Sequence, residues 1–396
     1  MKIINGTIYT PAYQFQKGCL DIQGTVIKEI TMNPSISNEE AFYDAKDCYV
    51  IPGLIDLHFH GCVGKDFCDG IPESLEAIAH YEATQGITGI CPASMTFSED
   101  TLTHIMTNAR QYYALHNSPE SKSLQTDCAD LLGINLEGPF LSEAKKGAQN
   151  AAFLHKPDVV LFERLQAASG NLIRIADIAP EMDENFHFIK EVSKNCTVSL
   201  AHTAADYALC MKAFESGASH VTHLFNAMNG FTHREPGLPG AAFDTPKCHV
   251  ELICDGIHIA PSAIRMAFAL YGAERIVLIS DSMMATGMPD GSYSLGGQPV
   301  TVQGTLATLS DGTIAGSATN LMDCVRKAVS FGVPLESAIR CATANPAKVI
   351  KASSYGSLAA GFVANVVILN PDLTIRDVFL HGQKLPTHRK DKIHES

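Results

Sequence analysis

Side chains that can bind a divalent metal follow several short apolar segments of the sequence. The first segment ends in Asp56-Leu57-His58-Phe59-His60, where one residue separates the two histidines. Because side chains alternate between the two faces of a strand, His58 and His60 point to the same side and can reach one metal ion. The other segments of this kind end in a carboxylate or an imidazole, at Glu137, His202, His223 and Asp281.

Each of these residues has a simpler structural interpretation when it is taken alone. A single histidine at a strand end is more often a hydrogen-bonded core residue than a ligand. Glu137 alone fits a solvated loop, and Asp281 alone fits the cap of a following helix. Metal-competent side chains at the ends of five strands are nevertheless improbable by chance, so we predict a divalent metal centre.

The segments that must position these side chains are β-branched or apolar and alternate with helix-like stretches. They cover residues 50–60, 86–96, 131–140, 173–181, 196–204, 220–228, 249–258 and 275–284. Eight strands alternating with helices are typical of a (β/α)8 barrel, whose active site lies at the C-terminal ends of the strands. An open doubly wound sheet is the alternative, but no G-x-G-x-x-G or Walker pattern follows a strand.

Both ends of the chain have a different texture, with short apolar runs separated by turn residues. This pattern predicts a small β domain formed by residues 1–51 together with 354–396, beside a barrel domain of residues 52–353. The Gly-rich, strand-like stretch Gly287–Gly316 predicts a hairpin inserted near the mouth of the barrel.

The composition excludes several classes of partner and compartment. The 396 residues include 29 Lys+Arg and 42 Asp+Glu, a net charge of −13, so nucleic acid and anionic membrane surfaces would be repelled. No apolar run reaches the roughly 18 residues of a membrane span, and the N-terminal segment lacks the apolar core of a secretory signal. The 12 cysteines include no C-x-x-C pair, which favours reduced thiols and a cytoplasmic protein.

Longer motifs resemble a known family. The segments that resemble the metal-dependent amidohydrolase superfamily are PGLIDLHFHG (52–61), SDS (280–282) and ATANPAK (342–348). Those that resemble its N-acetylglucosamine-6-phosphate deacetylase branch are LEGPFLSEAKKGA (136–148), THLFNAMNGFTHREPG (222–237), DGIH (255–258) and AGS (315–317). The resemblance implies a (β/α)8 barrel with a β-sandwich domain from both termini. It also implies hydrolysis of a phosphorylated N-acetylhexosamine to acetate and an amino-sugar phosphate.

The resemblance further implies how the metal is bound. Glu137, His202 and His223 would hold one ion, and His58 with His60 would hold a second ion bridged by Glu137. Zinc is the expected metal, with iron, manganese, cobalt, nickel or cadmium as alternatives. Asp281 would also contact the metal, and it is the best general base: it would take a proton from the attacking water and deliver it to the departing amine.

An anionic substrate needs local cationic or N–H donors in so acidic a protein. The forked guanidinium of Arg234 suits a phosphate, although an ion pair with Glu235 is the simpler interpretation. The resemblance places Arg234 in the neighbouring site of a homodimer. The other residues that it implies at the substrate are Ala148, Gln149, Asn226, Ala227, His258, Ile314, Ala315 and Gly316.

Gln149 departs from the family, which commonly has a histidine there that binds the acetyl carbonyl. A glutamine amide can donate a hydrogen bond, but unlike histidine it cannot take up and carry a proton. The change indicates either a two-metal site that needs less help from this residue at the acetyl carbonyl, or a different hexosamine substrate, such as the galactosamine epimer. Hydrolysis of another N-acyl or cyclic amide, and a barrel that has lost its chemistry, are the remaining alternatives; the latter would normally have lost ligands.

Overall fold

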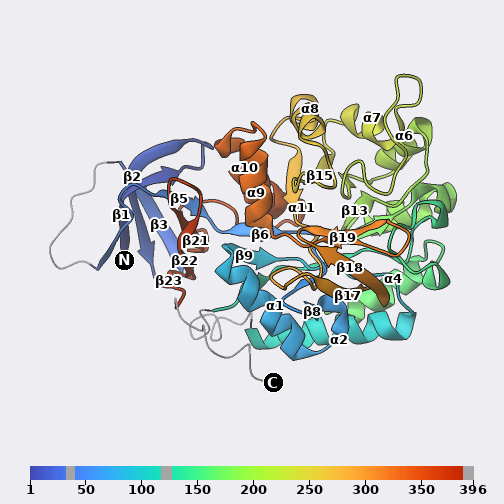
Figure 1. The fold of residues 1–396 in the computed structure, drawn as a ribbon, viewed down its shortest axis with the longest axis horizontal. Helices are drawn as coiled ribbons and strands as arrows, with labels where there is room; N and C mark the ends of the chain where they lie inside the picture. Colours follow the sequence, from blue (N-terminus) through green and yellow to red (C-terminus); the bar gives the residue numbers. More distant parts are fainter. Residues whose placement is uncertain (33–40, 117–126, 387–396) are drawn as a thin grey trace.

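The computed structural model describes residues 1–32, 41–116 and 127–386. The predicted range 354–396 therefore extends into residues 387–396, which lie outside the described part. Within that part, parallel strands form two arcs of sheet with helices outside them (Figure 1). The barrel strands are β6 (Leu54–Asp56), β9 (Ile87–Ile90), β10 (Asp130–Leu131) continued by β11 (Ile134–Leu136), β12 (Ile173–Ile178), β13 (Thr197–Leu200), β14 (His220–Val221), β15 (His249–Ile253) and β16 (Ile276–Ile279).

Backbone hydrogen bonds close the barrel between its first and last strands. Strands β11 to β16 pair in sequence order, and β6, β9 and β10 form the other arc. The amide of Asp281 donates to the carbonyl of His58 (2.9 Å), and the amide of His60 donates to that of Ser282 (2.7 Å). The predicted (β/α)8 barrel is therefore confirmed, and closure brings two candidate site segments side by side.

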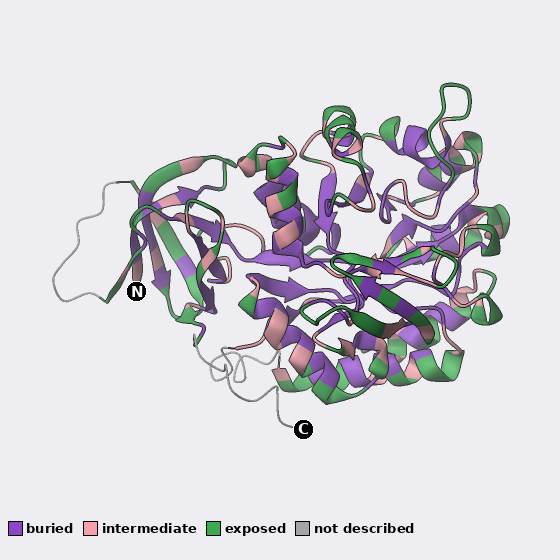
Figure 2. Cartoon of the chain, in the orientation of Figure 1, coloured by how far each residue is buried: buried purple, intermediate pink, exposed green. Residues whose placement is uncertain are grey.

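Helices surround the barrel, with buried faces toward the strands and exposed faces outward (Figure 2). They are α1 (Pro72–Thr84), α2 (Glu99–His116), α4 (Val159–Ala168), α5 (His187–Val192), α6 (Tyr207–Glu215), α7 (Gly237–Phe243), α8 (Pro261–Tyr271), α9 (Leu321–Ser330), α10 (Leu335–Ala342) and α11 (Ala344–Val349). Strand residues alternate between two environments. Leu54 packs in the large cluster that contains helix residues, whereas Ile55, Ile175 and Ile253 form a separate cluster inside the barrel.

The two ends of the chain form one further sheet beside the barrel. Its strands are β1 (Lys2–Tyr9), β2 (Phe15–Gln23), β3 (Val26–Thr31), β4 (Phe42–Asp44), β5 (Tyr49–Pro52), β21 (Val366–Leu369), β22 (Ile375–Leu380) and β23 (Gln383–Lys384). β21 pairs antiparallel with β5, which joins the C-terminal strands to the N-terminal ones. Ile3, Leu20, Val366 and Phe379 pack in its core. The expected β domain from both termini is thus present.

The insertion after the last barrel strand is larger than the predicted hairpin. It is a four-stranded antiparallel sheet of β17 (Gly291–Leu295), β18 (Gln298–Gln303), β19 (Leu306–Thr308) and β20 (Ile314–Ser317). Glycines at 296, 297 and 304 have φ values of 57°, 78° and 60°, so two of the three connections in this sheet are tight turns, where a single turn was expected. Ser317 donates its amide to the Asp281 carbonyl (2.7 Å), which fixes the insertion beside the barrel mouth.

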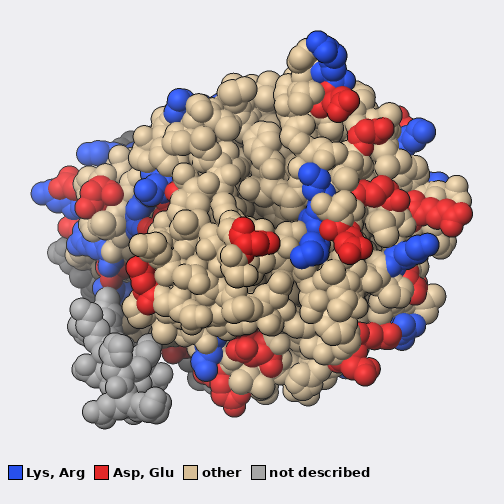
Figure 3. Space-filling view, turned by 45° about the vertical axis from the view of Figure 1, so that its right-hand side comes forward, with Lys and Arg blue, Asp and Glu red and all other residues tan. Residues whose placement is uncertain are grey.

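Short elements complete the described chain. They are the hairpin β7 (Gly61–Cys62) and β8 (Lys65–Asp66) and the 3-10 turns Phe67–Asp69, Glu143–Lys145, Ala151–Phe153, Pro180–Met182 and Glu184–Phe186. Among the described residues, no helix combines the length and apolar character required to cross a bilayer. On the face shown in Figure 3, basic and acidic side chains are interspersed.

Candidate active site

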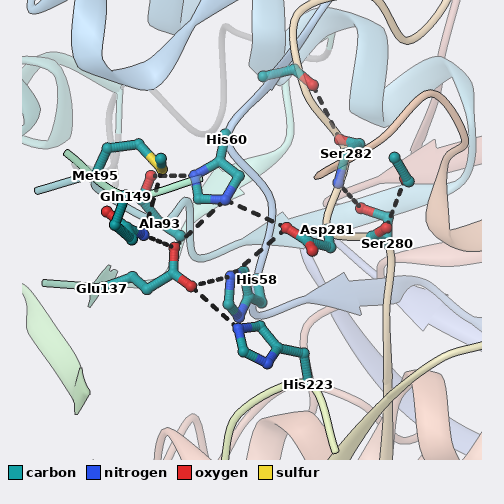
Figure 4. Close-up of polar contacts among 12 residues, drawn as sticks. His58, His60, Ala93, Met95, Glu137, Gln149, His223, Ser280, Asp281 and Ser282 are labelled. Carbon is teal, nitrogen blue, oxygen red and sulfur yellow. Dashed lines mark hydrogen bonds and ion pairs between the residues drawn. The ribbon is translucent and has the colours of Figure 1, made fainter. Parts of the chain in front are cut away.

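Glu137 lies at the centre of the side chains predicted to bind metal, at the C-terminal end of the barrel (Figure 4). Its Oε1 atom lies 3.0 Å from His202 Nε2, 3.3 Å from His223 Nε2 and 3.5 Å from His58 Nε2. Its Oε2 atom lies 3.5 Å from His60 Nε2. The structure therefore brings together five of the predicted metal-binding side chains, which follow four different strands.

Hydrogen bonds on the far side of the imidazole rings orient them toward Glu137. His60 Nδ1 lies 3.3 Å from the Ala93 carbonyl, and His202 Nδ1 lies 2.8 Å from the Lys145 carbonyl. A carbonyl only accepts, so each Nδ1 carries the proton and each Nε2 presents a lone pair to the centre. Such outer hydrogen bonds are typical of metal-binding histidines.

The unpaired atoms at this centre fit a divalent cation. His58 Nε2 is buried without a hydrogen-bond partner. Two groups have ligand atoms close enough to share one ion: His58, His60 and Glu137 in one, and Glu137, His202 and His223 in the other. Imidazole and carboxylate donors in sets of three suit zinc and similar metals with an open coordination position.

Three of the polar residues at the strand ends adopt left-handed backbone conformations. His202, His223 and Asp281 have φ values of 44°, 32° and 50°. This conformation destabilises a residue other than glycine by roughly 1–3 kcal/mol, and residues strained in this way are concentrated at functional sites. The turns direct these side chains inward at the points where the strands β13, β14 and β16 end.

Asp281 lies beside the histidines that follow β6. Its Oδ1 atom is 3.2 Å from His60 Nε2 and 3.8 Å from His58 Nε2. Burial alone would raise the pKa of Asp281, but the His60, His58 and His258 imidazoles beside it outweigh burial and lower the pKa. The carboxylate is therefore ionised near neutral pH, as a proton acceptor must be.

A cavity of ≈310 Å³ opens above these side chains. Of the residues implied to bind substrate, those that line it are Ala148, Gln149, Asn226, Ala227, His258, Ile314 and Gly316. Ala315 does not line it: side chains alternate along β20, and Ala315 is fully buried within the inserted sheet. Arg234 does not line it either, because it lies on an exposed loop between β14 and α7.

Gln149 contacts the central carboxylate directly. Its Nε2 donates to Glu137 Oε2 (3.0 Å) and contacts Met95 Sδ (3.6 Å), while its Oε1 accepts the Thr96 amide (2.8 Å). The Thr96 amide only donates, which fixes the orientation of the Gln149 amide group. One N–H thus holds Glu137, and the other reaches only a weak sulfur acceptor that a substrate carbonyl can replace.

His258 enters the cavity with a fixed ring orientation. Its Nδ1 donates to Asp255 Oδ2 (2.7 Å), and Asp255 also accepts the amides of Ile257 and His258 (2.9 Å each). Burial would lower the pKa of His258, but the hydrogen bond to Asp255 outweighs it and raises the pKa. A protonated His258 supplies positive charge to an anionic ligand.

Sequence reasoning missed two carboxylates inside the barrel. Glu251 on β15 is fully buried and lies 3.0 Å from His58 Nδ1 through its Oε2. Asp177 on β12 is fully buried and accepts a hydrogen bond from Thr222 (2.9 Å). The sequence did contain a signal for these residues. Each is an acid within an apolar strand, Glu251 in HVELI and Asp177 in IRIADI, and a buried carboxylate requires a partner.

Comparisons with known proteins agree with this geometry. The sequence model of the Amidohydrolase family matches residues 49–385. The chain belongs to the amidohydrolase family. Members with similar sequences include the N-acetylglucosamine-6-phosphate deacetylase of Bacillus subtilis (strain 168), 38% identical over 83% of this chain and 82% of the relative. The N-acetylgalactosamine-6-phosphate deacetylase of Escherichia coli O157:H7 is 33% identical over 84% of this chain and 86% of the relative.

Solved structures of amidohydrolases from the same branch share the whole fold. A mutant N-acetyl-D-glucosamine-6-phosphate deacetylase of Mycobacterium smegmatis, in complex with N-acetyl-D-glucosamine 6-phosphate, superposes with a TM-score of 0.89 at 30% identity. The match covers 97% of this chain and 98% of that one. The corresponding enzyme of Pasteurella multocida also gives a TM-score of 0.89, at 26% identity over 97% of this chain and 98% of that one. The family predicted from the motifs is confirmed.

Proposed function

We propose that this amidohydrolase removes the acetyl group of N-acetylglucosamine 6-phosphate and releases acetate and glucosamine 6-phosphate. The observation that carries the proposal is the convergence of Glu137 and four histidines with the ionised Asp281 at the base of one cavity. Relatives at 30–38% identity over most of the chain bear the names of hexosamine-phosphate deacetylases, which supports this substrate class.

Residues Glu137, His202 and His223 would hold one divalent ion, and His58 and His60 would hold a second one with Glu137 shared. Zinc suits these donors best among the candidate metals. When bound, the metal supplies Lewis-acid activation of water and of the amide carbonyl.

Asp281 moves the proton that amide hydrolysis requires. Its Oδ1 atom accepts a proton from the attacking water and returns it to the nitrogen as the C–N bond breaks, because an amine leaves only when protonated. His60, 3.2 Å away, keeps the carboxylate ionised and aimed at the cavity. Gln149 offers an N–H to the acetyl oxygen while it holds Glu137 in place.

The phosphate requires positive charge, and none of the described residues that line the cavity is a lysine or an arginine, whereas His258 is one of them. Arg234, on its exposed loop, would enter the site of a second copy in a homodimer and bind the phosphate with its guanidinium. The described chain contains 12 cysteines without a disulfide, which supports a reducing, cytoplasmic location.

The Asp281→Asn variant tests the mechanism. Asparagine keeps the shape but accepts no proton, so kcat should fall about 10²- to 10⁴-fold while metal content and substrate affinity stay near the wild-type values. Turnover at the wild-type rate would contradict the role of Asp281.

A further inference from the structure

We infer that Glu251 is the positioning residue of the metal centre, holding one histidine of each ligand triad through a single carboxylate oxygen. Oε2 of Glu251 lies 3.0 Å from His58 Nδ1 and accepts the backbone amide of His223 at 3.1 Å. His58 belongs to one triad and His223 to the other. This inference deepens the proposed function, because it concerns the same site.

The side chain of Glu251 reaches this position because of strand alternation. In β15, Val250 and Leu252 pack in the cluster that contains the helices, whereas Ile253 packs inside the barrel. Glu251 has the parity of Ile253 and therefore points inward, below the ligands. It is fully buried, so solvent offers no alternative partner to its carboxylate.

The contact determines which nitrogen of His58 faces the centre. A carboxylate accepts, so Nδ1 of His58 carries the proton and donates it to Glu251. The Nε2 atom then presents its lone pair, and it is the nitrogen that is buried without a partner and lies 3.5 Å from Glu137. His60 and His202 use backbone carbonyls for the same purpose, so His58 alone among these three depends on a side-chain charge.

The other oxygen of Glu251 has no comparable contact. Oε1 is buried without a hydrogen-bond partner. His220 Nδ1 lies 3.8 Å from it and is hydrogen-bonded to Ser199 instead. An apolar strand residue at position 251 would avoid this cost. The buried charge is therefore explained by its two contacts through Oε2.

Metal affinity separates this role from the proposed function, since it can be measured without substrate. The metal-free Glu251→Gln variant is titrated with Zn²⁺ in competition with a chromophoric chelator, and a loss of about 10- to 100-fold in affinity is expected. Glu82→Gln is the matched control: Glu82 is a buried acidic side chain on α1 whose neighbours include Asp56 and the Cys62 thiol, and its variant should keep wild-type affinity.

A double variant shows whether Glu251 acts through His58. In a His58→Asn background, Glu251→Gln should weaken Zn²⁺ binding by a much smaller factor, because the imidazole that it orients is gone. Wild-type affinity in Glu251→Gln, or the same fold loss in both backgrounds, would overturn the inference. If Glu251→Gln does not fold, Glu251→Asp replaces it: the shortened carboxylate should also lose affinity, and unchanged binding would again overturn the inference. Loss of deacetylase activity alone tests the proposed function and not the Zn²⁺ affinities on which this inference depends.

Discussion

Nε2 of His202 and Nε2 of His223 lie 3.1 Å apart, and both face Oε1 of Glu137. His202 holds its proton on Nδ1, which points to the Lys145 carbonyl, so its Nε2 presents a lone pair. A cation shared by Oε1 of Glu137 and the two Nε2 atoms would account for this close approach. The relationship therefore fits a barrel built around a metal.

Metal removal should therefore destabilise the protein as well as inactivate it. An ion present at 1,000 times its Kd stabilises the folded state by about 4 kcal/mol. Dialysis against a chelator should lower the melting temperature and stop acetate release, and added Zn²⁺ should restore both. A chelated protein with unchanged melting temperature would argue against the metal centre.

Gln149→His tests the departure from the family at the acetyl subsite. Histidine loses the N–H that holds Glu137 Oε2 but gains a group that can carry a proton. We expect the variant to change turnover and the preference between glucosamine and galactosamine substrates, measured as kcat/KM for each. Identical values for the variant and the wild type would show that position 149 has no such role.

Arg234→Ala should weaken the use of phosphorylated substrate. Loss of a hydrogen bond to a charged group costs about 1.5–3 kcal/mol, which corresponds to roughly 10- to 100-fold in kcat/KM. The rate on the unphosphorylated sugar should stay the same. Equal losses on both substrates would contradict a phosphate contact.

Mixing two impaired variants tests whether Arg234 acts across a dimer. In a heterodimer of Arg234→Ala and Asp281→Asn chains, one site has a wild-type Asp281 and receives a wild-type Arg234 from its partner. Mixed and re-equilibrated chains should show higher kcat/KM for the phosphorylated substrate than either variant alone. If no activity returns although heterodimers form, Arg234 does not act in trans.

His249 should make stability depend on pH. Burial and the nearby His220 lower the pKa of His249 to about 4, against 6.5 when unfolded. The unfolded chain binds the proton more readily, so this contribution is complete above pH 6.5 and is lost as pH falls toward 4, on the order of 3 kcal/mol. Denaturant unfolding of His249→Gln should show a smaller loss over this window. The exposed His187→Gln variant serves as control and should follow the wild type; if His249→Gln follows it too, the prediction fails.

The sequence predicted those features that depend on local pattern. Strand ends place His202, His223 and Asp281 at one rim whatever the details of packing, because parallel strands in a barrel share a direction. The pairing of β5 with β21 also follows the predicted pattern, since both are short apolar strands that need a partner.

Features that depend on tertiary contact were not predictable in the same way. Glu251 acts through a residue 193 positions away, and strand pattern alone does not show which histidine an inward acid meets. Ala315 lies between Ile314 and Gly316 in the sequence, yet alternation along β20 places those two residues at the cavity and Ala315 in the buried interior of the inserted sheet. The proposed role of Arg234 requires a second chain, and the sequence of one chain contains no periodic signal of such an interface.

The proposed deacetylase activity is tested by measuring acetate release by the zinc-loaded protein from N-acetylglucosamine 6-phosphate. The same assay with its galactosamine epimer and with unphosphorylated N-acetylglucosamine defines the specificity. We predict rapid release from the phosphorylated glucosamine substrate, loss of that release in Asp281→Asn, and little release from the unphosphorylated sugar. Equal rates with and without the phosphate, or no acetate from any of the three sugars, would contradict the account.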